Sequence, residues 1–336
     1  MGQKTPMNLA DSLAPPMLTT AAIGGSAWRG RDLAADDYRV TLSPACLDEI
    51  HRTAAAIQNY PLPTILLTTD EYPMPLCRAA MAEVRRRLDG RPRFALVDRL
   101  PVEEMSVEEA KAVYWLLASL VARPVAQSLS GIMIYDVEDT GQKATPGSGI
   151  RPDKTNIELH FHNDNNYNRT PPDYVGLLCL RPARQGGISR VVSFATIHNE
   201  ILRRRPNLLA RFYRPYWFDR QREYRPGEPV VFAAPIFEYD GTLKARLSLH
   251  QIPGGYALAG ETMDEETAAS LALLREIFAE DDLAVTFDFA PGRMQFVHNR
   301  AIGHARTAFA PEPDPECRRH LVRLWLRDTG LRAYPG

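Results

Sequence analysis

Residues 156–167, NIELHFHNDNNY, place three ligand-type side chains, His160, His162 and Asp164, at alternate positions. The stretch begins with a strand-like pattern and ends in a polar loop. Side chains two positions apart on a strand share a face. His162 and Asp164 can therefore offer a nitrogen and an oxygen to one metal ion. They would supply two ligands of the two-His-one-carboxylate set that holds Fe(II), so a third ligand must come from elsewhere.

Composition indicates a globular protein without a polyanionic partner. The chain has 336 residues, of which 45% are hydrophobic, and a net charge of -1. No charge excess would steer nucleic acid or an anionic membrane surface. The longest apolar run, residues 112–122, is shorter than the roughly 20 residues that span a bilayer. The N-terminal stretch lacks the apolar centre of a secretory signal, so a cytoplasmic protein is expected.

The first third of the chain predicts a layer of three helices. Ser43 and Pro44 are suited to the start of a helix, a second helix is expected over 76–88, and Ser106 with Glu109 forms a capping box before a third. The four cysteines have no C-x-x-C spacing, which favours four separate buried thiols over a zinc or redox site.

The rest of the chain is mainly strand-like, which favours a barrel or sandwich. Helices are expected over 194–214 and after a capping box at Thr262 and Glu265, and Asp240-Gly241 predicts a hairpin. A polar segment, 139–156, is either a disordered surface loop or a lid that closes over the substrate. We expect a lead-in at 1–35, one domain over 36–330 and a tail at 331–336. The expected strands are 131–137, 173–180, 189–193, 230–239, 243–249, 283–290, 293–299 and 320–327.

The final expected strand contains Arg323 among apolar residues on both faces. A buried, unpaired guanidinium is costly, so such an arginine usually meets an anion. Its planar fork of donors matches a carboxylate. Arg323 is therefore a candidate anion-binding residue.

Three stretches together resemble the taurine dioxygenase-like, clavaminate synthase-like Fe(II)/2-oxoglutarate dioxygenases. They are His162-x-Asp164, PPDYVGLLCLRPARQGGISRVVS (171–193), and NRAIGHARTAF (299–309) followed by RRHLVRLWLR (318–327). The resemblance covers roughly residues 90–327. It implies an α+β, mainly β chain with a double-stranded β-helix, or jelly-roll, core flanked by helices.

The same resemblance assigns roles to particular residues. His162, Asp164 and His304 would bind Fe(II), while Ser189 and Arg323, with Arg319 as a neighbour, would bind the cosubstrate 2-oxoglutarate. The implied activity is hydroxylation of a small polar substrate with O2, releasing succinate and CO2. No partner beyond the small molecule is implied, and a homo-oligomer is compatible with the sequence.

Two other histidines and two other functions stay open at this point. His160 shares a strand face with His162, and His298 lies six residues before His304, so either could contact metal or substrate. A cupin-type metal enzyme that does not use 2-oxoglutarate, or a catalytically silent binding protein on the same fold, are the alternatives.

The substrate is expected to be an amino acid or another small carboxylate or sulfonate, bound under the 139–156 segment. Candidate contacts are Arg151, Asn165, Tyr167 and Arg220. Arg214 and Arg222 lie in the same basic, aromatic segment as Arg220. Because loop arginines are usually solvated, the aromatic residues of that segment are the alternative: Tyr216, Trp217 and Phe218.

Overall fold

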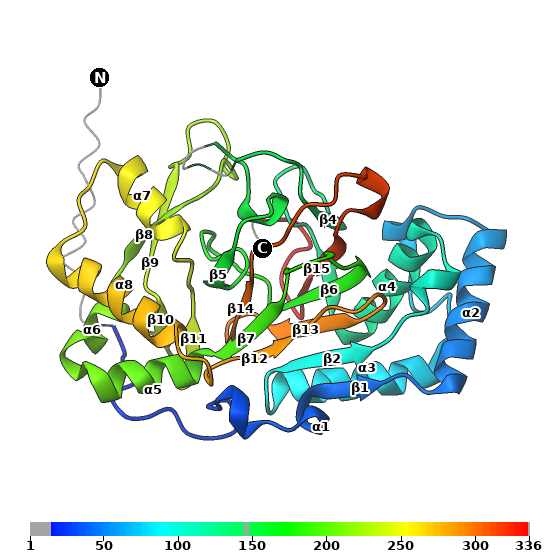
Figure 1. Ribbon diagram of the computed structural model, residues 1–336, viewed down its shortest axis with the longest axis horizontal. Helices are drawn as coiled ribbons and strands as arrows, with labels where there is room; N and C mark the ends of the chain where they lie inside the picture. Colours follow the sequence, from blue (N-terminus) through cyan, green and yellow to red (C-terminus); the bar gives the residue numbers. More distant parts are fainter. Residues whose placement is uncertain (1–14, 144, 146–147, 335–336) are drawn as a thin grey trace.

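A seven-stranded sheet and a four-stranded sheet, each with helices beside it, make up the fold (Figure 1). The computed structural model describes residues 15–143, 145 and 148–334, so part of the expected lead-in, lid and tail lies outside the described residues. The expected mixture of helices with a strand-rich second half is confirmed. No helix among the described residues is long and apolar enough to cross a membrane.

The larger sheet is antiparallel except for its first pair of strands, which is parallel. Two short strands share one edge of β15 because they pair with opposite ends of it. The order is β1 (Arg39–Thr41), β2 (Phe94–Asp98), β13 (Met294–His298), β6 (Tyr174–Arg181), β15 (His320–Arg327) and β3 (Arg123–Val125), with β4 (Tyr135–Glu138) also on β15.

Three helices, α2 (Pro44–Asn59), α3 (Pro75–Asp89) and α4 (Val107–Val121), pack together beside this sheet (Figure 1). We call them the helical layer. The Ser43 hydroxyl accepts the Cys46 amide at the start of α2, and Ser106 and Glu109 cap each other's backbone at the start of α4. These helix starts were predicted from the sequence and are confirmed.

The smaller sheet carries the histidines of the motif and is antiparallel, in the order β12 (Val285–Phe287), β7 (Ser189–Ser193), β14 (Ile302–Arg306) and β5 (Leu159–His162). The remaining helices and hairpins lie in the same half of the molecule (Figure 1). They are α5 (Phe194–Arg204), α6 (Leu209–Phe212), α7 (Gln251–Ala259) and α8 (Glu265–Phe278), with hairpins β8 (Tyr216–Asp219) to β9 (Val231–Ala234) and β10 (Phe237–Tyr239) to β11 (Leu243–Ala245). A short helix, α1 (Ala35–Tyr38), precedes β1, and 3-10 turns lie at Gly30–Asp32, Thr64–Leu66, Val102–Glu104, Pro152–Lys154, Pro206–Leu208 and Pro315–Cys317.

Strand β15 divides the interior because its two faces enter different cores. Leu321 and Trp325 belong to the apolar cluster that contains the smaller sheet. Val322, Leu324 and Leu326 belong to the cluster that contains the helical layer. Since successive side chains on a strand alternate, Arg323 lies on the same face as Leu321 and Trp325, toward the smaller sheet.

Several expected boundaries are wrong, each for a local reason. The expected strand 230–239 is two strands because Pro235 lacks the amide that a continuous ladder needs. The strand expected over 131–137 begins only at Tyr135. Helix α8 is capped by Asp264, whose side chain accepts the Thr267 amide, and not by Thr262. The cysteines are also not four separate buried thiols, because Cys317 is exposed and two others are in contact.

Candidate metal centre

The register of the smaller sheet brings two histidines of the motif regions face to face. His304 of β14 is the direct partner of His162 of β5 in an antiparallel pair. Directly opposed residues on neighbouring strands are the closest side-chain pairs in a sheet. The centres of the two imidazole rings are accordingly 4.4 Å apart.

Asp164 completes the cluster from the turn after β5. Its Oδ1 lies 3.7 Å from Nε2 of His162 and 3.4 Å from Nε2 of His304. Two atoms bound to one ion at about 2.0–2.2 Å can be no more than about 4.4 Å apart, and both distances satisfy that limit. Ligand atoms of His162, Asp164 and His304 all lie within 4.8 Å of one another. The donor set and its spacing therefore fit a facial metal site.

Hydrogen bonds set the ligand atoms in the form that a metal requires. Nδ1 of His162 lies 2.8 Å from the carbonyl oxygen of His160, which fixes the proton on Nδ1 and leaves the Nε2 lone pair free. Burial, reinforced by the neighbouring His304, lowers the pKa of His162 to about 4, so the ring is neutral at pH 7.

The Asp164 carboxylate is kept ionised although it is buried. Burial alone would raise its pKa, but Arg323, His304 and His162 outweigh burial and lower that pKa. Trp325 Nε1 donates to Oδ2 at 2.6 Å, which leaves Oδ1 to face the histidines. Asn299 clamps the backbone of Asp164, accepting its amide and donating to its carbonyl. No sequence pattern pointed to Asn299 or Trp325 as part of the site.

A small cavity of about 50 Å³ lies beside the cluster. It is lined by the expected cosubstrate residues Ser189, Arg319 and Arg323. Arg319 is 6% exposed and has no acidic partner among the described residues. Burial lowers the pKa of its guanidinium to about 10. A Cβ at Gly187 would lie 3.3 Å from Arg319 Nε, and Gly187 has a φ of +71°, so this glycine suits both the turn and the arginine.

Arg323 is held differently from Arg319. Its Nη1 lies 2.8 Å from an oxygen of Asp153 and 3.2 Å from Oδ2 of Asp164, and its Nε donates to Gln127 at 2.9 Å. Asp153 belongs to the turn Pro152–Lys154, at the end of the 139–156 segment. The sequence led us to expect an anion beside Arg323. In this structure that anion is supplied by two carboxylates of the protein, those of Asp153 and Asp164.

A second cavity, of about 170 Å³, is lined by the motif loop and three of the four expected substrate residues, Arg151, Asn165 and Tyr167. His162, Asp153 and Arg323 line both cavities, so the two adjoin at the cluster. Arg220 is not among the lining residues, and its guanidinium instead donates to the carbonyl groups of Pro229 and Glu223.

The other ambiguous side chains lie outside the ligand cluster. His160 is exposed beside Glu158 at the rim of the larger cavity. His298 packs edge-on against Tyr174. Arg214 pairs with Glu266 at the surface, and Tyr216 and Phe218 are buried in the core.

Comparisons with known proteins agree with this geometry. The family model described as taurine catabolism dioxygenase TauD, TfdA family, matches residues 67–325. FR-33289 synthase of Streptomyces rubellomurinus is 28% identical over 324 residues, covering 95% of this chain and 94% of that protein. L-asparagine oxygenase of Streptomyces coelicolor is 28% identical over 270 residues, covering 72% of each chain.

Solved structures show the same fold. Asparagine oxygenase in complex with Fe(II), 2S,3S-3-hydroxyasparagine and succinate matches with a TM-score of 0.64 and 23% identity, covering 87% of this chain and 94% of that one. The non-heme iron oxygenase OrfP in complex with Fe and alpha-ketoglutaric acid matches with a TM-score of 0.63 and 13% identity, with the same coverage.

The fold and the buried His-Asp-His cluster define a non-haem iron oxygenase. The chain belongs to the TauD, TfdA family of taurine catabolism dioxygenases, because the family model spans most of it. It is an Fe(II)/2-oxoglutarate-dependent dioxygenase that also uses O2. When bound, the iron supplies the oxidation of a substrate C–H bond coupled to conversion of 2-oxoglutarate to succinate and CO2. Neither the cupin-type nor the silent alternative is supported.

Proposed function

We propose that the protein hydroxylates a small zwitterionic substrate, an amino acid or a related carboxylate or sulfonate. The observation that carries this proposal is the pairing of opposite charges around the 170 Å³ cavity. Arg151 and Arg323 line it together with Asp153 and Glu158, and both arginines are already paired, Arg151 with Glu223 and Arg323 with Asp153. A substrate with one acidic and one amino group can exchange into these ion pairs and meet a partner for each of its charges.

The names of relatives point the same way. A similar solved structure holds hydroxyasparagine and another holds hydroxyarginine, so both of those proteins take amino acids. These two structures support amino acids as the substrate class and do not favour one particular amino acid. The charged residues that line the 170 Å³ cavity independently support an amino-acid substrate for this chain.

The cosubstrate would lie in the smaller cavity, with its distal carboxylate between Arg319 and Ser189. The sequence led us to expect Arg323 as the main anchor. Arg319 suits that role better because its guanidinium is buried and has no acidic partner in the part of the chain that the structure describes, whereas Arg323 is already paired with Asp153 and Asp164. Arg323 would then face the end of the cosubstrate nearest the metal, and the Ser189 hydroxyl would add a neutral donor.

The described part of the 139–156 segment would exclude water from the site. Its turn Pro152–Lys154 reaches both cavities through Asp153. Excluding water strengthens the charge interactions that orient substrate. The seven-stranded and four-stranded sheets, with His162 and His304 on the four-stranded one and Asp164 in the turn after it, would form the double-stranded β-helix typical of the family. We also propose that the protein works in the cytoplasm.

Replacing Arg319 tests the cosubstrate assignment. Arg319→Ala should raise the KM for 2-oxoglutarate by roughly 30-fold or more, because truncating one member of a buried charge pair costs about 2–5 kcal/mol. Ser189→Ala should cost about 1–2 kcal/mol, as for a neutral donor. Arg319→Lys keeps the charge and should recover part of the affinity. An unchanged KM in Arg319→Ala, with a large increase in Arg323→Ala, would return the role to Arg323.

A substrate screen tests the chemical class. Succinate release should rise above the uncoupled rate with an amino acid and fall when either its carboxylate or its amine is blocked. Arg151→Ala should then raise the KM for that substrate while leaving uncoupled 2-oxoglutarate turnover nearly unchanged, because Arg151 lies outside the smaller cavity. Equal stimulation by blocked and free substrates would contradict the proposal.

A further inference from the structure

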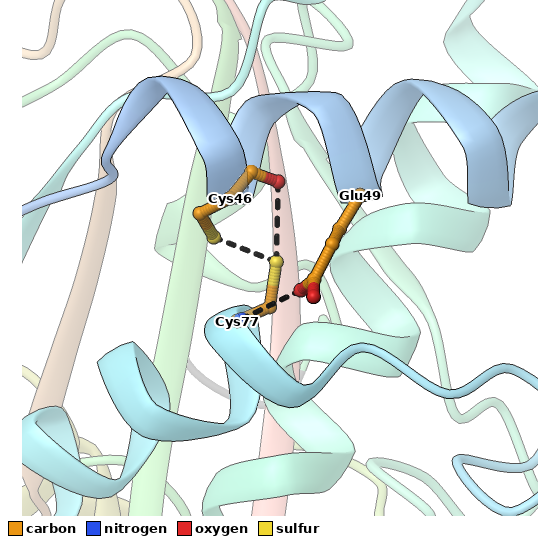
Figure 2. Close-up of side chains that lie close together, drawn as sticks. All are labelled: Cys46, Glu49 and Cys77. Carbon is orange, nitrogen blue, oxygen red and sulfur yellow. Dashed lines mark hydrogen bonds between the residues drawn. The ribbon is translucent and has the colours of Figure 1, made fainter.

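Two cysteines that are far apart in the sequence touch each other in the helical layer. Cys46 lies in the first turn of α2 and Cys77 in the first turn of α3, and their sulfur atoms are 2.6 Å apart (Figure 2). Both side chains are buried, with exposures of 1% and 0%. The dioxygenase chemistry described above uses neither thiol.

A third residue fixes the distance between the two helix starts. Helix α3 begins after Met74, whose side chain cannot cap it, and Glu49 of α2 does so instead. The Glu49 carboxylate accepts hydrogen bonds from the backbone amide of Leu76 and from that of Cys77, the second of which is drawn in Figure 2. Because Glu49 lies one turn after Cys46 on α2, this cap holds Cys46 against Cys77.

The group has the composition of a metal site but not the geometry of one. Cys46, Glu49 and Cys77 bring their ligand atoms within 4.8 Å of one another. Two thiolates on a tetrahedral zinc ion at about 2.3 Å would be about 3.8 Å apart, and these sulfur atoms are closer. Both oxygens of Glu49 also already accept backbone amides. A metal would require the cap to break and the sulfur atoms to separate.

We propose that Cys46 and Cys77 form a reversible disulfide that joins the first turns of α2 and α3 when the protein meets a peroxide oxidant. The Cys46 thiolate attacks hydrogen peroxide and becomes a sulfenic acid, releasing hydroxide. Cys77 sulfur then attacks the Cys46 sulfur, and the sulfenic oxygen leaves as water with the remaining proton. In sum, two thiols lose two hydrogens and two electrons, and one peroxide becomes two water molecules.

The surroundings favour Cys46 as the first thiol to react. The hydrogen bond between the two thiols lowers the pKa of Cys46 and raises the pKa of Cys77, and at Cys46 it outweighs burial and the Glu49 charge, which raise the pKa of both thiols. A surface hollow of about 730 Å³, lined in part by Glu49 and Tyr72, lies next to the pair. Peroxide would reach the buried sulfur atoms from this hollow when the Glu49 cap over Cys77 opens.

The bond should change stability and leave catalysis alone. It would close a loop between positions 31 residues apart, which restricts the unfolded chain. The helical layer packs on the face of β15 opposite to the one that carries Arg323. The expected effect is a rise in Tm of roughly 5 °C, with kcat and KM unchanged.

The test uses the full-length protein with Cys317→Ser, because the exposed Cys317 would form unrelated adducts. Of the four cysteines, three remain. After stoichiometric peroxide and denaturation, one titratable thiol should be left, peptide mapping should link Cys46 to Cys77, and dithiothreitol should restore three thiols and the lower Tm. The matched control adds Cys46→Ser, which should lose both the cross-link and the rise in Tm.

Other outcomes would overturn the inference. Three thiols remaining after peroxide, or separate sulfinic acids on the two peptides, would show that the pair does not close. Stoichiometric zinc released from the reduced protein by a thiol reagent would show a metal site. If Cys46→Ser does not fold, the peptide map of the Cys317→Ser protein decides alone.

Discussion

The two faces of β15 meet interiors of opposite character. Toward the smaller sheet the strand presents Arg323 to a network of carboxylates and amides around the metal cluster. Toward the helical layer it presents Val322, Leu324 and Leu326 to apolar side chains of α2, α3 and α4. One strand of eight residues, all buried, thus belongs to both a polar site and an apolar core.

This difference shows how the fold accommodates a site whose buried charges lower its stability. Buried charges cost free energy unless each is paired, and pairing requires partners at fixed positions. The face toward the helical layer carries no charge and gains stability from buried apolar area. We therefore expect substitutions on the site face to change chemistry first, and substitutions on the helix face to change stability first.

The largest expected effect is the loss of the metal from the site face. His304→Ala removes one of the three proposed ligands and should reduce both iron binding and succinate formation by more than about 100-fold, since even residues that only support a ligand cost 10–100-fold. Iron content by mass spectrometry and succinate release measure the two losses in the same sample.

His160→Ala is the matched control for that experiment. His160 lies two residues from His162 on the same strand, but its imidazole is largely exposed beside Glu158. Its removal should leave iron content unchanged. Loss of iron from His160→Ala together with retention in His304→Ala would transfer the ligand role to His160.

A core truncation tests the opposite face. Leu324→Ala leaves a cavity against the helical layer and should lower the free energy of unfolding by about 2–5 kcal/mol. The KM for 2-oxoglutarate should not change, because Leu324 does not line either site cavity. Denaturant unfolding and steady-state kinetics on the same preparation separate the two quantities.

Leu321→Ala is the comparison on the other face of the same strand. Leu321 is equally buried but lines the small cavity with Arg319. Its truncation should cost stability and also raise the KM for 2-oxoglutarate. If both leucine variants changed the KM equally, the two faces would not be separate in function.

The parts of the molecule that sequence reasoning found are those with a local signature. Alternating apolar residues predicted most strands, and His162-x-Asp164 depends only on the period of one strand. Helix α7 was missed because Pro253, Gly254 and Gly255 are poor helix formers. A Cβ at Gly255 would collide with the backbone of Trp217, so close packing on β8 explains the glycine.

The details of the site depend on contacts between distant residues, and no local pattern records them. Asp153 and Gln127, which hold Arg323, are 170 and 196 residues away from it. Because the sequence does not reveal these contacts, it could not separate the roles of Arg319 and Arg323. The contact between Cys46 and Cys77 was missed for the same reason.

The smallest expected effect is a pH dependence that follows one glutamate. Glu200 of α5, in the site half, is mostly buried, with 11% of its side chain exposed. Burial alone would raise its pKa, but hydrogen bonds from Arg203, Arg29 and Arg204 outweigh burial and lower the pKa to about 2. A carboxylate with a lowered folded-state pKa stabilises the protein above its unfolded pKa of about 4.3, and that stabilisation is lost as the pH falls toward 2.

Glu200→Gln should therefore lower the free energy of unfolding at pH 7 by no more than about 3 kcal/mol, and the difference from the parent protein should vanish as the pH approaches 2. Glu83→Gln in α3 is the matched control. Glu83 also has arginines three and four residues later, Arg86 and Arg87, but 32% of its side chain is exposed. Water screens exposed pairs, so its effect should stay below about 1 kcal/mol. Urea unfolding at several pH values measures both, and equal effects of the two substitutions would mean that burial does not strengthen the Glu200 pairs.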